Sequence, residues 1–196
     1  MAATIRKPEE VATIDSVLIV LTPEDGNGDA IGVTSNTEVA TEVQIETTDA
    51  NKLIIKGELK AQKPEKKTIT GIKLTLTDNM TLIEMAQAVQ GGEIVKDSNG
   101  KILKYTPPVV GSGEAQKKYT ADVYTAVMDE SGDIINYEKT TYKHCTGEPV
   151  AYNAKDEEWR TAEYVLNSMP KKGEAPYTVE YVEELPTVTE PAEPVA

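Results

Sequence analysis

Polar and apolar residues alternate along most of this chain of 196 residues, which is the pattern of half-buried β-strands. Within TEVQIETTD (41–49), Val43, Ile45 and Thr47 share one face, and the opposite face carries Glu42, Gln44, Glu46 and Thr48. A continuous apolar run, SVLIVLT (16–22), predicts a buried strand. The first part of the chain is therefore predicted to form β-strands.

The remaining strands define the fold class. KLIIKGELKAQ (52–62) and KTITGIKLTLTD (67–78) are predicted to pair as one long antiparallel hairpin joined by the charged loop KPEKK. Further strands are predicted within 93–105, 118–143, 148–155, 159–168 and 177–185. Roughly nine antiparallel strands with turns at this spacing are typical of a β-sandwich or barrel, so the predicted class is mainly β.

The period changes once, where a short helix is expected at about 79–91. Leu82, Met85, Ala86 and Val89 follow the spacing of an amphipathic helix. Asp78, Asn79 or Thr81 could cap its start, and Gly91–Gly92 suit the left-handed conformation that ends a helix.

A single domain is expected over residues 16–185. Residues 1–15 are interpreted as a polar N-terminal arm. Residues 186–196, PTVTEPAEPVA, form an acidic, Pro-rich tail without the apolar side chains that would offset the entropy of ordering it. The longest apolar stretch, VLIVL (17–21), is too short to span a membrane.

Charge and cysteine content exclude several classes of protein. The formal net charge is −13, from 33 acidic and 20 basic residues, so specific binding to nucleic acid is disfavoured. One cysteine cannot form an internal disulfide or a cysteine-based zinc site.

The only histidine and the only cysteine are adjacent, as His144 and Cys145 in TTYKHCTGEPV (140–150). Neighbouring residues of a strand point to opposite faces, so the two side chains are not expected to form a catalytic pair. A zinc site would need carboxylates for its other ligands, which is uncommon. We interpret Cys145 as a small buried packing residue.

No other motif supports catalysis or a cofactor. PEDGNGDAIG (23–32) alternates Asp, Asn and Asp but lacks the closing glutamate of a calcium loop. GSGEAQKK (111–118) lacks the strand-to-helix context of a phosphate loop, and the acidic clusters, Glu9–Glu10, Asp156–Glu158 and Glu183–Glu184, are interpreted as solvated charges. We expect no enzyme activity, no metal and no cofactor.

The polar face of segment 38–78 has two interpretations. It fits a solvated face of an antiparallel sheet. It equally fits the lining of a water-filled bore, formed when several copies pair their edges into a closed barrel. Pattern alone does not separate the two.

The C-terminal half resembles bacteriophage major tail tube proteins. LTLTDNMTLIEMAQAVQGG resembles the strand that enters a short helix ending in Gly-Gly, and a hairpin follows it. A VYTAV strand, an SG turn, a Y-x-K-x-x-Y strand and a C-x-G-x-P bend then follow in the family's order, over about 70–182. One departure is Lys143–His144, where the family's bend usually carries Pro-Asn.

This resemblance implies a self-assembling virion protein. Such subunits form hexameric rings that stack into a tube, through which DNA passes into the host without specific binding. Tape measure and tail initiator or terminator proteins are the implied partners, and assembly takes place in the bacterial cytoplasm. Ring stacking in the family uses an N-terminal arm and a long loop, which here correspond to 1–15 and to a loop near 23–37 or 57–68.

The resemblance also assigns roles to particular residues. Glu42, Gln44, Glu46 and Glu58 are the predicted bore-facing side chains, and an acidic bore would repel DNA phosphates. Cys145, Gly147 and Pro149 mark the predicted bend.

The alternative function is an immunoglobulin-like or adhesin-type binding module, whose exposed aromatic cluster would be Tyr137, Tyr142 and Tyr152.

Overall fold

The computed structural model describes residues 10–111, 116–152, 156–157 and 160–188. Within these residues the protein is mainly β, with antiparallel sheets and one short helix, as predicted. The strands are β1 (Ala12–Pro23), β2 (Ile31–Val33), β3 (Asn36–Thr48), β4 (Asn51–Ile55), β5 (Glu58–Lys63), β6 (Lys66–Asp78), β7 (Glu93–Lys96), β8 (Ile102–Thr106), β9 (Tyr119–Met128), β10 (Ile134–Gly147), β11 (Ala162–Ser168) and β12 (Thr178–Val182), and the helix is α1 (Ile83–Gln90).

Eight of the described strands form one sheet in the order β2-β1-β9-β10-β11-β6-β3, with β12 also paired to β10. The length of β10 allows this branch, because its first half pairs with β12 and its last residues pair with β11. The sheet curls until β3 contacts β1, where Asn36 Nδ2 lies 3.4 Å from the carbonyl oxygen of Ser16. No ladder joins β1 to β3 in the described chain, so the barrel stays open.

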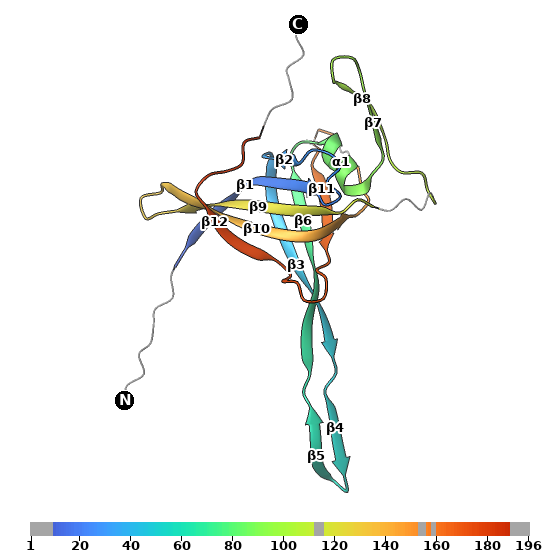
Figure 1. Ribbon diagram of the computed structural model, residues 1–196, viewed down its shortest axis with the longest axis vertical. Coiled ribbons are helices and arrows are strands. Elements are labelled where there is room, and N and C mark those ends of the chain that lie inside the picture. The colour runs from blue at the N-terminus through green and yellow to red at the C-terminus, as the bar shows by residue number, and fades with distance from the viewer. Residues whose placement is uncertain (1–9, 112–115, 153–155, 158–159, 189–196) are drawn as a thin grey trace.

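The core lies inside this curled sheet, and α1 covers one end of it (Figure 1). Met85, Ala86 and Val89 of the helix are buried, as the sequence pattern predicts. The expected side-chain cap is not observed: Leu82 precedes the helix, and the Tyr164 hydroxyl contacts its backbone instead. Gly91 ends the helix at φ 82° and donates its N–H to the Gln87 carbonyl.

The predicted pairing of 52–62 with 67–78 is wrong. β6 pairs with β3, and the segment 51–63 folds back on itself as the β4–β5 hairpin. Its turn is Lys56–Gly57, where φ is 50° and 81°, the two left-handed residues that a tight type I′ hairpin turn requires. KPEKK (63–67) is therefore not the turn of this hairpin. It connects the end of β5 to β6, and its last two residues are the first two of β6.

Three smaller expectations also differ from the structure. Twelve strands are present in the described residues where roughly nine were predicted, in part because the predicted strand 52–62 divides into β4 and β5 and because the three-residue strand β2 was not predicted. Residues 148–152 form no strand, since Pro149 has no N–H and the Val150 N–H donates to Gln90 Oε1 at 2.8 Å. β1 begins at Ala12, inside the range predicted for the arm, while residues 1–9 lie outside the described chain.

Candidate assembly surfaces

A two-stranded ribbon of β3 and β6 leaves the body and continues into the β4–β5 hairpin, so that the molecule has a long projection (Figure 1). One face of the ribbon is polar. Glu42 pairs with Lys73, Gln44 with Gly71 and Glu46 with Thr68, which places the three predicted β3 side chains on one face. Lys73 is 3.8 Å from Glu148, so this face carries both signs of charge.

The opposite face of the ribbon is apolar and continues directly from the core. Val43 pairs with Ile72, which is buried, whereas Val43 itself is 45% exposed. One step further out, Ile45 pairs with Ile69, and these residues are 54% and 43% exposed. The apolar stripe that packs the core therefore extends beyond the body, and there it faces solvent in the single chain.

The end of the projection is both apolar and basic. The apolar side chains of the β4–β5 hairpin are exposed: Leu53, Ile54, Ile55 and Leu59. Residues 51–67 contain six lysines and two glutamates, which leaves 14 basic and 31 acidic residues in the rest of the chain. Glu58, predicted to face the bore, lies at this tip beside Lys60, apart from Glu42, Gln44 and Glu46.

The outer edge of β3 is open. β3 pairs with β6 alone among the described strands, so its other edge presents an unpaired row of backbone groups, which approaches β1 only near Asn36. A long edge strand is a template for pairing with another chain. The ribbon thus offers an edge, an apolar face and a tip for contact.

His144 is held between two glutamates. Its Nδ1 is 2.7 Å from Glu24 Oε2, its Nε2 is 3.0 Å from Glu174 Oε2, and its backbone N–H donates to Glu24 Oε1 at 2.7 Å. Burial by itself raises the pKa of Glu24, but the hydrogen bonds from His144 outweigh it and hold this pKa below its usual value. The histidine therefore ties three segments of chain together.

Cys145 belongs to the core rather than to this ionic cluster. Its side chain is fully buried, with Sγ 3.5 Å from the Tyr142 carbonyl oxygen. Burial raises the pKa of the Cys145 thiol to about 12, so little thiolate is present at neutral pH. Cys145 and His144 thus lie in different environments, and no nucleophile–base contact is recorded between them.

The predicted bend brings the chain against the helix. An ideal Cβ added to Gly147 would lie 1.9 Å from the Val89 carbonyl oxygen, so only glycine fits there. The next N–H, of Glu148, donates to the Val165 carbonyl at 2.9 Å, and Pro149 follows. Close packing of backbone on backbone therefore explains the Gly in this motif.

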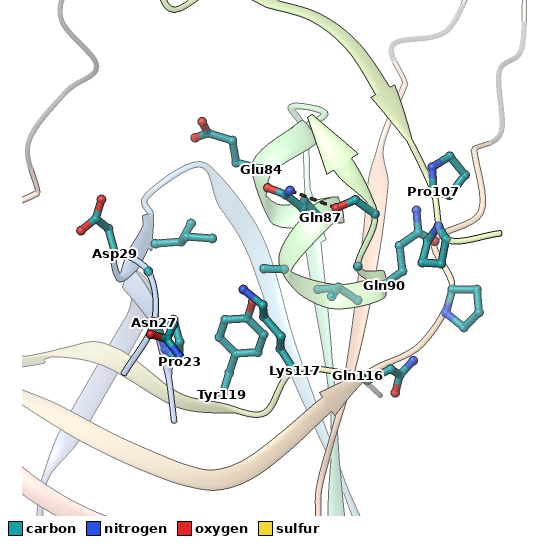
Figure 2. A pocket seen from close by; sticks show the side chains of 18 of the residues that line it. Pro23, Asn27, Asp29, Glu84, Gln87, Gln90, Pro107, Gln116, Lys117 and Tyr119 are labelled. Carbon is teal, nitrogen blue, oxygen red and sulfur yellow. Dashed lines mark hydrogen bonds between the residues drawn. The ribbon is translucent and has the colours of Figure 1, made fainter. Parts of the chain in front are cut away.

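A groove of about 700 Å³ lies beside α1 (Figure 2). Its walls are α1, the loop after β1 and the segments around Pro107 and Tyr119. Asp29 and Glu84 stand on different walls, and Lys117 also lines the groove. Gln87 is held by a hydrogen bond of 3.1 Å to the Gly92 carbonyl, the dashed line in Figure 2.

The other candidate sites contain no cluster for a metal. Asp25 accepts the Asn27 N–H at 3.0 Å, which makes the 23–32 loop a side-chain-stabilised turn. Across the residues that the structure describes, no three His, Cys, Asp or Glu side chains are grouped to hold an ion. Part of 111–118 and part of 156–158 lie outside those residues. No helix in the described part of the chain is long and apolar enough to cross a membrane.

The fold and these surfaces define a mainly β protein with an open curled sheet and a projecting ribbon. No protein-family model and no curated protein matches the chain. Among solved structures, it is similar to a chain of the anti-feeding prophage baseplate, determined by cryo-EM with 6-fold symmetry: identity is 7%, coverage 92% of this chain and 97% of that one, and the TM-score 0.33. A likeness at this TM-score supports no statement about fold or function.

Sequence reasoning missed the tip as a separate surface. The alternation in KLIIKGELKAQ (52–62) predicts one long strand, whereas in the structure the chain reverses inside this segment. The sequence signal for the turn is Lys56–Gly57, which predicts a hairpin turn less strongly than Asn-Gly does. The groove had no local signal, because its walls come from distant segments.

Proposed function

We propose that this protein is a structural subunit of a phage-type tail, and that copies assemble into rings that stack as a tail tube. The observation that carries the proposal is the exposed apolar face of the ribbon at Val43, Ile45 and Ile69. A two-stranded ribbon alone is marginally stable in water, so this one needs neighbours. A second copy paired along the β3 edge would extend the sheet, and packing of the body of that copy against the ribbon would cover the apolar face.

We propose a tube rather than another assembly because the sequence resembles those of tail tube proteins. Lateral pairing of ribbons would bring their polar faces to one side of a closed sheet, with Glu42, Gln44 and Glu46 lining the bore. The role of Glu58 in the bore stays a prediction, because this residue lies on the hairpin tip. The hexameric state, the tape measure and initiator partners, DNA passage and assembly in the host cytoplasm are parts of the same proposal.

No specific observation favours the binding-module alternative. Tyr142 is buried and lies 6.1 Å from the Tyr177 ring, so it presents no free aromatic surface. Tyr152 is exposed, but the Arg160 guanidinium stacks over its ring at 4.4 Å. We also propose no catalytic role, since both ring nitrogens of His144 are engaged by carboxylates.

Negative-stain microscopy and sedimentation of the full chain test the proposal. We expect rings or tubes about 100 Å wide, the size that six domains of this mass give. Ile45→Asp should abolish them, whereas Ile135→Asp, on an exposed residue outside the ribbon, should not. A chain that stays monomeric at millimolar concentration, with ribbon amides protected from exchange, would contradict the proposal, because the ribbon would then be stable without a partner.

A further inference from the structure

Two Asn-Gly pairs lie in exposed loops of this protein, Asn27–Gly28 after β1 and Asn99–Gly100 between β7 and β8. Asparagine followed by glycine is prone to lose its side-chain amide without an enzyme, because glycine has no Cβ to keep its backbone nitrogen away from the asparagine side chain. By sequence the two pairs are equivalent, so any difference between their reactivities comes from the fold.

The fold restrains the reacting nitrogen of the second pair. The Gly100 N–H donates to the Asp97 carbonyl at 3.1 Å, and Asp97 Oδ1 accepts the N–H groups of Asn99 and Lys101, both at 2.9 Å. The Gly100 nitrogen must lose its proton and turn toward the Asn99 side chain before it can attack, so this turn has to open first. One such hydrogen bond shifts the equilibrium that frees its donor by about tenfold.

Gly28 has no such restraint. Its N–H donates to no acceptor recorded in the described part of the chain. The Asn27 N–H donates to Asp25 Oδ1 at 3.0 Å, which orders the residue before the reacting nitrogen and leaves that nitrogen free. A Cβ added at Gly28 would have Pro23 Cγ as its nearest recorded neighbour, at 3.8 Å, so there is room for the backbone to move here.

We propose that Asn27 is a site of spontaneous modification, where the asparagine converts to a mixture of aspartate and isoaspartate. The Gly28 nitrogen attacks Cγ of Asn27 and forms a carbon–nitrogen bond that closes a succinimide ring. The bond from Cγ to the side-chain nitrogen breaks, and this nitrogen leaves as ammonia after it receives, through solvent, the proton from the Gly28 nitrogen. Water then opens the ring at either carbonyl carbon, so the reaction needs no oxidant or reductant.

The modification changes one wall of the groove beside α1, because Asn27, Gly28 and Asp29 all line it (Figure 2). The product places a new carboxylate in a loop that already carries Asp25 and Asp29, and makes the formal net charge more negative than −13. Isoaspartate also lengthens the backbone of the loop by a methylene group. The charge and shape of this wall therefore change with the age of the molecule, and this inference does not depend on the proposed function.

Incubation of the full-length protein in mildly alkaline buffer, followed by mass spectrometry of its proteolytic peptides, tests the site. In the folded protein Asn27 should lose its amide about tenfold faster than Asn99, and in urea the two should react at equal rates, because the turn at Asp97 is then lost. Asn99 reacting as fast as Asn27 in the folded protein would overturn the inference. The same ratio of rates in urea would overturn it too, because sequence rather than fold would then set the difference.

A pair of aspartate variants tests the cause of the difference. Asp97→Ala removes the acceptor that orders the turn, so the rate at Asn99 should rise toward that at Asn27. The matched control is Asp129→Ala in the β9–β10 turn, where Asp129 Oδ1 accepts the N–H groups of Ser131 and Asp133 in the same way and no Asn-Gly pair is present. The control should change neither rate. An unchanged rate at Asn99 in Asp97→Ala would show that the turn does not protect this site, and the inference would fail.

Discussion

Nδ1 of His144 lies 2.7 Å from Oε2 of Glu24, although 120 residues separate them in the chain. Glu24 follows the end of β1, and His144 lies in β10, so the contact joins two elements of the curled sheet. Glu174 contacts the other ring nitrogen from the loop before β12. One histidine thus holds three segments, and this makes it a determinant of stability at the bend.

Glu24→Gln should destabilise the protein by about 1–2 kcal/mol at pH 7, because a neutral amide with a single acceptor oxygen replaces an ionised carboxylate that accepts from His144 with both oxygens. The pKa of Glu24 is lowered in the folded state, so its contribution is present above the ordinary value of 4.5 and is lost as pH falls through the folded value. The free energy of unfolding is measured with urea between pH 3 and pH 7, in roughly unit steps. As the pH falls, it should decrease less for the variant than for the wild type. If the free energies of unfolding of the variant and the wild type changed with pH in parallel, the ionisation of Glu24 would not contribute to stability.

Cys145 should react with thiol reagents about a thousand times more slowly than a free thiol at pH 8, because its pKa of about 12 leaves little thiolate. Burial of the sulfur adds to this protection. The measurement is titration with a chromogenic disulfide in native buffer and in denaturant. Reaction of the native protein at the rate of the unfolded one would place the thiol at the surface.

Gly147→Ala should destabilise the protein by about 3 kcal/mol or more, because its Cβ would overlap the Val89 carbonyl oxygen of the helix backbone. Gly32→Ala is the control. Its Cβ would meet the Val188 side chain at 3.0 Å, and an exposed side chain near the end of the chain can move. Thermal unfolding of the two variants compares them directly, and equal melting temperatures would refute the close approach at 147.

Tyr164→Phe should cost about 1–2 kcal/mol, because the buried hydroxyl bonds both the N–H and the carbonyl of Leu82, at 2.9 Å and 3.1 Å. These bonds take the place of a side-chain cap at the start of α1. Hydrogen exchange at the first turn of the helix should quicken in this variant. Tyr177→Phe, on an exposed ring, should leave the exchange unchanged.

Local pattern was sufficient for much of the fold. The alternation in 41–49 correctly separated Val43 and Ile45 from the polar face, and the helical spacing located α1 with its buried residues Met85 and Val89. Both results follow from chain geometry, since side chains alternate in a strand and repeat every 3.6 residues in a helix. The class of protein, mainly β, is a consequence of these periods.

Which strand pairs with which was decided only by the tertiary structure. Segments 52–62 and 67–78 have the same period as β3, so alternation alone could not tell that β6 pairs with β3 and that the chain reverses at Lys56–Gly57. The contact of Glu24 with His144 likewise depends on the pairing of β9 with both β1 and β10, and the walls of the groove beside α1 come from segments far apart in the sequence. The physical reason is that a period of two specifies the face on which a side chain lies, whereas the neighbouring strand is selected by packing of the whole sheet.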